Sequence, residues 1–237
     1  MTHAPRCHLL VPAAGVGSRA GTAQPKQYET VAGRPMVVHT LRALARVSGI
    51  HSLNVVVSPN DERMQGLVQA DPALQSVQVW PVGGETRAAS VSAGLRQLTQ
   101  AGAAPNDWVL VHDAARCLIQ PEWVQDLIEA CRADPVGGLL AIPLPDTLKQ
   151  ADDQQRVGAT LRRDDKWLAQ TPQMFGLGLL SRALTQAGLG VTDEASAIEA
   201  MGLQPKLVLG STLNFKVTYP DDLRLAALVL GAQENQT

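Results

Sequence analysis

Apolar and amphipathic segments alternate along most of the chain. Short runs rich in Val, Leu and Ile predict buried strands at 8–14, 53–58, 77–82, 108–115 and 138–144. Between them, apolar residues recur at helical spacing and predict helices at 35–47, 63–70, 86–100 and 122–133. Strands that are apolar throughout, with helices between them, are typical of a parallel sheet covered on both faces. We therefore expect an α/β fold, with a Rossmann-like, mainly parallel sheet and helices on both faces, in a single domain over residues 1–237.

The alternation stops at residues 144–163, which are polar and carry no helical apolar stripe. Two segments with strand character, 147–150 and 158–163, flank the acidic stretch 151–155 and predict a protruding β-hairpin arm. An extended arm commonly packs on a second subunit, so we expect a homodimer formed through it. Beyond the arm the pattern predicts helices at 177–188, 193–202 and 220–232, and strands at 205–211 and 215–218.

Composition excludes several classes of protein. The formal net charge is −2 and aromatic residues make up 3% of the chain, so a nucleic-acid-binding protein is not expected. Three irregularly spaced cysteines fit neither a disulfide framework nor a four-ligand zinc site. No run approaches the ~20 apolar residues of a membrane helix, and few residues precede the first strand, so we expect a cytoplasmic protein without membrane contact.

The first loop, "PAAGVGSRAGTAQPKQY" at residues 12–28, combines small residues with two cations. Residues 15–20 match the G-x-G-x-x-A dinucleotide fingerprint, but Gly21, Thr22 and Pro25 delay the next helix. No acidic residue follows at the distance of ~20 residues that a ribose contact needs, and the spacing of a Walker A loop is also missing. The alternative to a ligand site is a surface loop with solvated cations.

Small residues beside cations favour a phosphate site in this loop. Backbone N–H groups of Ala13, Ala14, Gly15 and Gly17 are suited to phosphate oxygens. Arg19 and Lys26 supply a guanidinium fork and a point charge for a polyphosphate. The loop therefore predicts a nucleoside triphosphate site.

Polar residues follow two other predicted strands. Asp113 and Arg116 come directly after the strand at 108–111, where Asp113 is either a ligand for ribose or Mg²⁺ or the N-cap of a helix. We expect His112 to be a packed, hydrogen-bonded residue. In "GGETRAASV", Glu85 and Ser90 are candidates for hydrogen bonds to a base, with helix capping an equally weighted alternative.

The residue types near these loops point to one kind of chemistry. The loops contain no Ser-His-Asp order, no His-rich metal set and no C-x-x-C. They supply cations and hydrogen-bonding groups, which suit transfer of a phosphorus group by positioning and charge neutralisation.

With these segments the chain resembles the 2-C-methyl-D-erythritol 4-phosphate cytidylyltransferase family nearly end to end. The resemblance rests on the ordered motifs "PAAGVGSRAGTAQPKQY", "GGETRAASV", "VHDAAR", "PDTLK", "TPQMF", "TDEASAIE" and "NFKVT". It implies an enzyme that joins CTP and methylerythritol phosphate into CDP-methylerythritol and releases pyrophosphate. It also implies Mg²⁺ bound mainly by the CTP phosphates, no metal ligand from the protein, and an arm that interlocks two subunits.

The resemblance also implies roles for single residues. Arg19 and Lys26 would stabilise charge on the triphosphate, and Arg163 and Lys216 would position the incoming phosphate, so these four are the implied catalytic residues. The implied nucleotide-binding residues are Pro12, Ala13, Ala14, Gly15, Gly17, Gly84, Glu85, Ser90, Asp113 and Ala114. The implied substrate-binding residues are Asp113, Arg116, Thr147, Arg163 and Lys216.

The chain departs from the family pattern at three positions. Cys117 stands where a proline is frequent, Ala20 where a methionine is frequent, and Tyr219 where an arginine is common. None of these removes a phosphate-binding cation. Two alternatives stay open: a cytidylyltransferase for another acceptor such as ribitol phosphate, and a CTP-binding module without turnover. A glycosyltransferase is disfavoured because no D-x-D pair follows a predicted strand.

Overall fold

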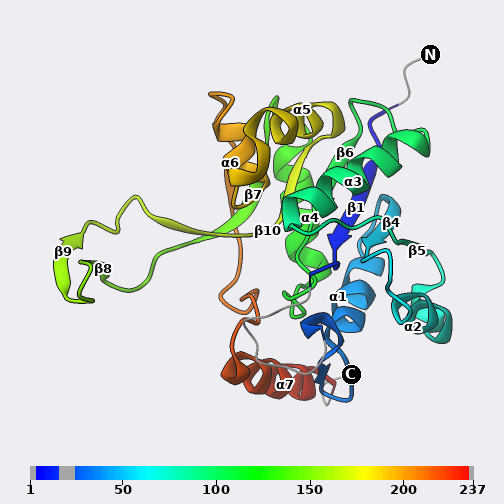
Figure 1. Cartoon of the computed structure of the whole chain (residues 1–237), viewed down its shortest axis with the longest axis horizontal. Coiled ribbons are helices and arrows are strands. Elements are labelled where there is room, and N and C mark those ends of the chain that lie inside the picture. Colours follow the sequence, from blue (N-terminus) through cyan, green and yellow to red (C-terminus); the bar gives the residue numbers. More distant parts are fainter. Residues whose placement is uncertain (1–3, 16–24, 235–237) are drawn as a thin grey trace.

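The computed structural model describes residues 4–15 and 25–234, and it has a central sheet with helices on both sides (Figure 1). The sheet order is β11-β7-β10-β6-β1-β4-β5. Its strands are β1 (Cys7–Pro12), β4 (Ile50–Val56), β5 (Val77–Trp80), β6 (Trp108–Val111), β7 (Gly137–Pro143), β10 (Trp167–Gly176) and β11 (Lys206–Leu209). The pairings are parallel except those of β10, which runs antiparallel to β6 and β7. The predicted mainly parallel α/β fold is confirmed.

Two apolar layers bury the two faces of this sheet. In β1, Leu9 and Val11 face one layer and Leu10 faces the other, and all three are fully buried. The helices α1 (Met36–Ala45), α2 (Met64–Ala70) and α4 (Pro121–Cys131) cover the first face, and α3 (Arg87–Gln100), α5 (Leu177–Ala187) and α6 (Glu194–Glu199) cover the second. Short 3-10 turns lie at η2 (Lys26–Tyr28), η3 (Pro72–Leu74) and η4 (Gly188–Gly190). Burial on both faces explains why these strands read as continuous apolar runs.

One helix lies unusually close to the sheet. A Cβ added to Gly94 of α3 would lie 2.6 Å from Cδ1 of Leu10 in β1. Glycine at this position therefore lets α3 approach β1, and the first turn of α3 is brought near the end of that strand. This placement matters for the site described below.

A third apolar cluster closes one end of the molecule. The last helix, α7 (Pro220–Glu234), packs there against the short strand β2 (Thr30–Val31), which pairs with β3 (Arg34–Pro35). Cys117 is buried in this cluster, and burial raises the pKa of its thiol to about 11. The cysteine that departs from the family pattern therefore serves as an apolar packing residue.

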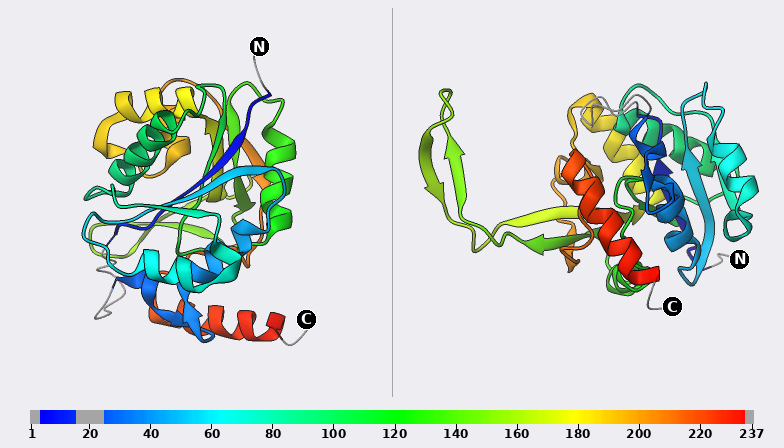
Figure 2. Two further views of the ribbon diagram at one scale, coloured as in Figure 1. Left: turned by 90° about the vertical axis from the view of Figure 1, so that its right-hand side faces the viewer. Right: turned by 90° about the horizontal axis from the view of Figure 1, so that it is seen from below.

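The predicted arm is an antiparallel hairpin that projects from the body (Figure 2). Its strands are β8 (Leu148–Ala151) and β9 (Val157–Leu161). Its stem is the outer part of β7 paired with the start of β10, where Trp167 pairs with Pro143. Val157 near its tip is 66% exposed and Leu161 is 40% exposed, so the arm presents apolar side chains to solvent.

Two sequence expectations differ from the structure. The strand expected at 215–218 is an irregular segment, in which Val217 is buried and its N–H donates to the Ala115 carbonyl at 2.9 Å. Conversely, β10 was not expected, because its centre carries Gln170, Thr171 and Pro172 rather than an apolar run. Within the described ranges, no helix is long and apolar enough to cross a membrane.

Candidate active site

A pocket of about 260 Å³ lies where β1 and β6 end. Its lining residues are Pro12, Ala13, Ala14, Gly15, Lys26, Gln27, Met36, Arg87, Ser90, Asp113, Ala114, Ala115 and Lys216. They come from the ends of β1 and β6, from η2, from the first turns of α1 and α3, and from the segment before α7. The pocket therefore occupies the carboxyl edge of the parallel strands, where ligands of such sheets bind.

Backbone contacts fix the small-residue loop after β1. The N–H of Ala13 donates to the Val56 carbonyl at 2.7 Å, and the Gln27 side-chain amide donates to the Ala13 carbonyl at 2.8 Å. The expectation that the Ala13 N–H binds phosphate is therefore wrong, because a strand carbonyl already accepts from it. A Cβ added to Gly83 would lie 2.3 Å from the Ala14 Cβ, so glycine at this position permits the loops to touch. Because Gln27 is tied to the loop, its neighbour Lys26 is brought to the pocket wall.

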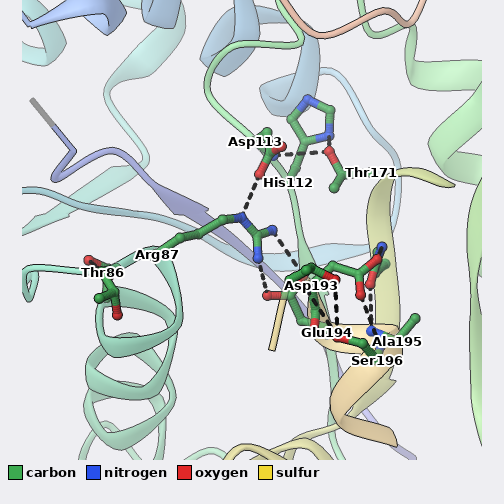
Figure 3. A network of polar contacts seen from close by, with 12 residues as sticks. Thr86, Arg87, His112, Asp113, Thr171, Asp193, Glu194, Ala195 and Ser196 are labelled. Atoms are coloured by element: carbon green, nitrogen blue, oxygen red, sulfur yellow. Dashed lines mark hydrogen bonds and ion pairs between the residues drawn. The ribbon is translucent and has the colours of Figure 1, made fainter. Parts of the chain in front are cut away.

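A chain of four alternating charges begins at the pocket and ends behind it at Glu194, and Figure 3 shows the part from Asp113 through Arg87 to Glu194. Lys216 Nζ contacts Asp113 Oδ2 at 2.7 Å, and Arg87 Nε donates to Asp113 Oδ1 at 2.8 Å. The two terminal nitrogens of Arg87 donate to both Glu194 oxygens, at 2.6 and 2.9 Å. The order is thus Lys216, Asp113, Arg87 and Glu194, with two cations and two carboxylates.

Burial and ion pairing shift the pKa values of these groups in opposite directions. Burial raises the pKa of Asp113, but the charges and hydrogen bonds of Arg87 and Lys216 outweigh it and hold that pKa far below its usual value. Burial lowers the pKa of Arg87, and its two carboxylate partners more than reverse this. For Glu194, burial raises the pKa, although Arg87 opposes the shift. Asp113 and Arg87 therefore remain charged at neutral pH.

His112 lies directly behind Asp113 in a defined hydrogen-bond chain. Its Nε2 contacts the Arg116 carbonyl at 3.2 Å, and a carbonyl can only accept, so Nε2 carries the proton. The Thr171 hydroxyl then donates to Nδ1 at 3.1 Å and accepts from the Asp113 N–H at 3.0 Å. Full burial lowers the pKa of His112 to about 4. The residue is neutral and packed, as the sequence predicts.

This histidine predicts a stability that falls in acid. The unfolded chain binds a proton at His112 below pH ~6.5, whereas the folded chain resists protonation until about pH 4. Stability contributed by the neutral form is therefore complete above pH ~6.5 and is lost as pH falls toward 4, by about 3 kcal/mol. Urea unfolding at pH 7.5, 6, 5 and 4.5 measures this loss.

The variant His112→Gln, which cannot titrate, isolates the contribution. Its free energy of unfolding should depend less on pH across that window than that of the wild type. Part of the dependence should remain, because burial also lowers the pKa of His8, with the same sign. Equal slopes for variant and wild type would assign the acid sensitivity to other groups.

The structure gathers most of the predicted loop residues into one pocket. Pro12, Ala13, Ala14, Gly15, Lys26, Ser90, Asp113, Ala114 and Lys216 all line it. Gly84 and Glu85 are beside it but do not line it, and Glu85 is exposed. Gly17 and Arg19 lie outside the described residues.

Three predicted residues have other surroundings in the single chain. The Arg116 guanidinium donates to the carbonyls of Asn214 at 2.6 Å and Ala169 at 3.2 Å. Thr147 and Arg163 belong to the base of the arm, where the Arg163 guanidinium donates to the Pro145 carbonyl. None of the three lines the pocket of its own chain.

The structure decides the capping alternatives for Asp113 and Ser90. The helix after β6 is α4, whose N-cap is Gln120, so the N-cap reading of Asp113 is wrong. Thr86 caps α3 by accepting from the Ala89 N–H at 3.0 Å. The Ser90 hydroxyl accepts from the Gly84 N–H at 3.1 Å and donates to the Thr86 carbonyl at 3.0 Å, so Ser90 holds the glycine loop against α3.

Several lining residues were not predicted from the sequence, and Arg87 is the most consequential of them. The others are Gln27, Met36 and Ala115. Arg87 is the first residue of α3, three positions before Ser90, and residues three apart share a helix face. That spacing was a usable signal. The partner that fixes Arg87, Glu194, lies 107 residues away and had none.

Comparison with known proteins identifies the family. The family model described as IspD, 2-C-methyl-D-erythritol 4-phosphate cytidylyltransferase, matches residues 7–232. A bifunctional IspD/IspF enzyme of Albidiferax ferrireducens is 59% identical over 95% of this chain, which spans only 53% of that protein. The 2-C-methyl-D-erythritol 4-phosphate cytidylyltransferase of Cupriavidus pinatubonensis is 50% identical over 95% of this chain and 94% of its own length.

Solved structures agree with these matches. A crystal structure of 4-diphosphocytidyl-2C-methyl-D-erythritol synthase superposes with a TM-score of 0.84 at 39% identity, covering 95% of this chain and 99% of the other. That of the Thermus thermophilus cytidylyltransferase gives 0.75 at 31% identity, covering 94% and 98%. Sequence and fold agree over nearly the whole length, and the chain belongs to the IspD family of 2-C-methyl-D-erythritol 4-phosphate cytidylyltransferases.

Proposed function

We propose that this chain transfers CMP from CTP to 2-C-methyl-D-erythritol 4-phosphate by direct in-line displacement in the pocket at the ends of β1 and β6. The products are CDP-methylerythritol and pyrophosphate. The observation that carries the proposal is the convergence of Lys26, Arg87 and Lys216 on the small-residue loop, in a chain of this family.

The attacking group needs no general base. A phosphate monoester carries about −1.5 to −2 charges at pH 7, so it is already a nucleophile. His112 fits this, because it is buried and both its ring nitrogens are in hydrogen bonds. The difficulty is to bring one polyanion against another. Cations placed in a pocket reduce that repulsion, and a single well-placed contact of this kind is worth roughly 2.7–4 kcal/mol.

The pocket residues divide between the two reactants. Backbone N–H groups of Ala14 and Gly15 and the ammonium of Lys26 would hold the triphosphate and stabilise the charge that develops on the leaving pyrophosphate. Lys216 would leave Asp113, or share it, to hold the incoming phosphate. Asp113 would then present a carboxylate oxygen to the ribose or to a substrate hydroxyl.

The donor set suits a metal ion brought in by the nucleotide. Asp113 is the carboxylate of the pocket lining, and both its oxygens already accept from cations. The charged side chains in the rest of the lining are the cations Lys26, Arg87 and Lys216, which bind phosphate rather than Mg²⁺. The Ser90 hydroxyl and the Gln27 amide already donate to backbone carbonyls. Mg²⁺ held by the CTP phosphates would supply neutralisation of their charge, without a protein carboxylate.

The arm would complete the pocket of a second subunit. In the single chain Thr147 and Arg163 lie away from the pocket, on a hairpin that projects from the body and exposes Val157 and Leu161 (Figure 2). Such an arm loses exposed apolar surface by packing on a second copy. We therefore include a homodimer in the proposal, with Thr147 and Arg163 facing the partner's acceptor phosphate.

Release of pyrophosphate tests the function directly. With CTP, Mg²⁺ and methylerythritol phosphate, the chain should release pyrophosphate and form a CDP-linked product. Release should cease on chelation with EDTA and be much slower with UTP or with ribitol phosphate. Faster release with ribitol phosphate would change the acceptor, and tight CTP binding without release under any condition would indicate a binding module.

A further inference from the structure

Glu194 is a buried carboxylate outside the pocket that nonetheless contacts a pocket residue. Its side chain is 1% exposed, and it does not line the pocket. Both of its oxygens are taken by the terminal nitrogens of Arg87, which does line the pocket. The hydrogen-bonded connection from Glu194 to the pocket therefore passes through Arg87.

The support beneath Glu194 is rigid. It is the first residue of α6, which begins with a capping box between Asp193 and Ser196 (Figure 3). Gln173 of β10 accepts from the Ala195 N–H at 2.8 Å and donates to Asp193 at 2.9 Å. The start of α6 is thereby tied to the central sheet, and so is the carboxylate of Glu194.

A bidentate contact fixes the direction of the third nitrogen of an arginine. The guanidinium is planar, so holding its two terminal nitrogens leaves Nε with one orientation. That orientation aims Nε at Asp113 Oδ1 and leaves Oδ2 to Lys216. The position of the Lys216 ammonium is thus set by a chain of contacts that begins at Glu194.

Removing the charge of Glu194 would redistribute these contacts. Arg87 would be a partly buried cation, 26% exposed, with a single carboxylate, and it would gain most by taking both oxygens of Asp113. Lys216 would then lose its partner and its fixed place. A buried ion pair is weak evidence for stability by itself, because well-packed apolar residues often replace one without loss. A positioning role for Glu194 would explain why a charged pair, rather than apolar side chains, lies behind the pocket.

We propose that Glu194 is a positioning residue for nucleotidyl transfer, which acts through Arg87 and Asp113 to hold the Lys216 ammonium where the incoming phosphate binds. The inference rests on the proposed function and names no new contact to substrate. Glu194 and Lys216 lie at opposite ends of one contact chain, so their effects on the reaction are coupled.

A double-mutant cycle tests this coupling. Glu194→Gln should lower kcat/KM about 10- to 100-fold, mainly by raising KM for methylerythritol phosphate, with KM for CTP changed much less. In a Lys216→Ala background the same substitution should lower kcat/KM less than about threefold, because the coupled group is already absent. Equal losses in both backgrounds would overturn the proposal.

A structural control separates positioning from loss of stability. Asp134→Ala removes the carboxylate that accepts from the Val136 and Gly137 N–H groups before β7, and it leaves Glu194, the start of α6 and the contact with Arg87 intact. It should lower thermal stability and leave both KM values and kcat near those of the wild type. If Asp134→Ala changed the kinetics as Glu194→Gln does, the role of Glu194 would be structural. Should Glu194→Gln fail to fold, Glu194→Asp, which keeps the charge, undergoes the same cycle.

Chemical labelling gives a readout that does not need turnover. Acetic anhydride should modify Lys216 several-fold faster in Glu194→Gln than in wild type, measured by peptide mass spectrometry, with Asp134→Ala at the wild-type rate. An unchanged rate would contradict the proposal. Absence of turnover in the wild type would refute the proposed function and leave this comparison to decide the role of Glu194.

Discussion

Replacing Lys26 with alanine is expected to lower turnover by about 10²–10³-fold while leaving the fold intact. The ammonium of Lys26 faces the pocket beside the small-residue loop, where the triphosphate is expected. Losing one charge contact to the leaving group in such a site costs roughly 2.7–4 kcal/mol of transition-state stabilisation, which is this loss of rate. Steady-state pyrophosphate release gives the number.

The local backbone does not depend on the Lys26 side chain. The turn η2 is held by the Tyr28 N–H to the Pro25 carbonyl at 2.9 Å and the Glu29 N–H to the Lys26 carbonyl at 3.0 Å. Gln27 secures it to Ala13. Truncation beyond Cβ leaves all these bonds, so the melting temperature should change little.

A matched substitution elsewhere shows that the effect is local. Lys206→Ala removes an exposed lysine of β11, whose ammonium donates to the Ala130 carbonyl away from the pocket. Its turnover should equal that of the wild type. Near-normal turnover in Lys26→Ala, with Lys206→Ala also normal, would contradict the role assigned to Lys26.

The sheet was predictable because its strands obey a local rule. Successive residues of a central strand face opposite layers, so Leu9, Leu10 and Val11 all had to be apolar, and a run of such residues signals a strand buried on both faces. The strand β10 carried no such signal. It runs antiparallel between β6 and β7, and the buried polar residues Gln170 and Thr171 interrupt it. Its place depends on tertiary pairing, which local sequence does not encode.

The pocket was partly predictable for a geometric reason. Loops that follow parallel strands lie at one edge of the sheet, so Ala13 after β1 and Asp113 after β6 had to lie near each other. The positions of residues that depend on packing between distant segments could not be predicted in this way. Lys216 reaches Asp113 from an irregular segment that had been expected to form a strand. The surroundings of Arg116, between the Asn214 and Ala169 carbonyls, likewise follow from the folded chain alone.

The position of Arg163 in the single chain does not match the role that the resemblance implies for it. The resemblance assigns it to the incoming phosphate, yet it lies on the arm, away from the pocket of its own chain. The two agree if the arm of one subunit reaches the pocket of the other. In that case Arg163→Ala should reduce turnover by about 10²-fold or more, as loss of a cation at the reacting phosphate would.

Mixing two inactive variants distinguishes a pocket shared between subunits from one within a single chain. A heterodimer of Lys26→Ala and Arg163→Ala, purified with two different tags, would have one pocket with both defects and one with neither. It should therefore recover roughly half of the wild-type turnover per dimer, whereas each homodimer stays nearly inactive. If the heterodimer were no more active than its parents, Arg163 would act in the pocket of its own chain or take no part in the reaction. If sedimentation analysis showed a monomer, the proposed role of the arm would be refuted. Recovery requires that an arginine of one chain complete the site of another, because neither variant carries an intact site by itself.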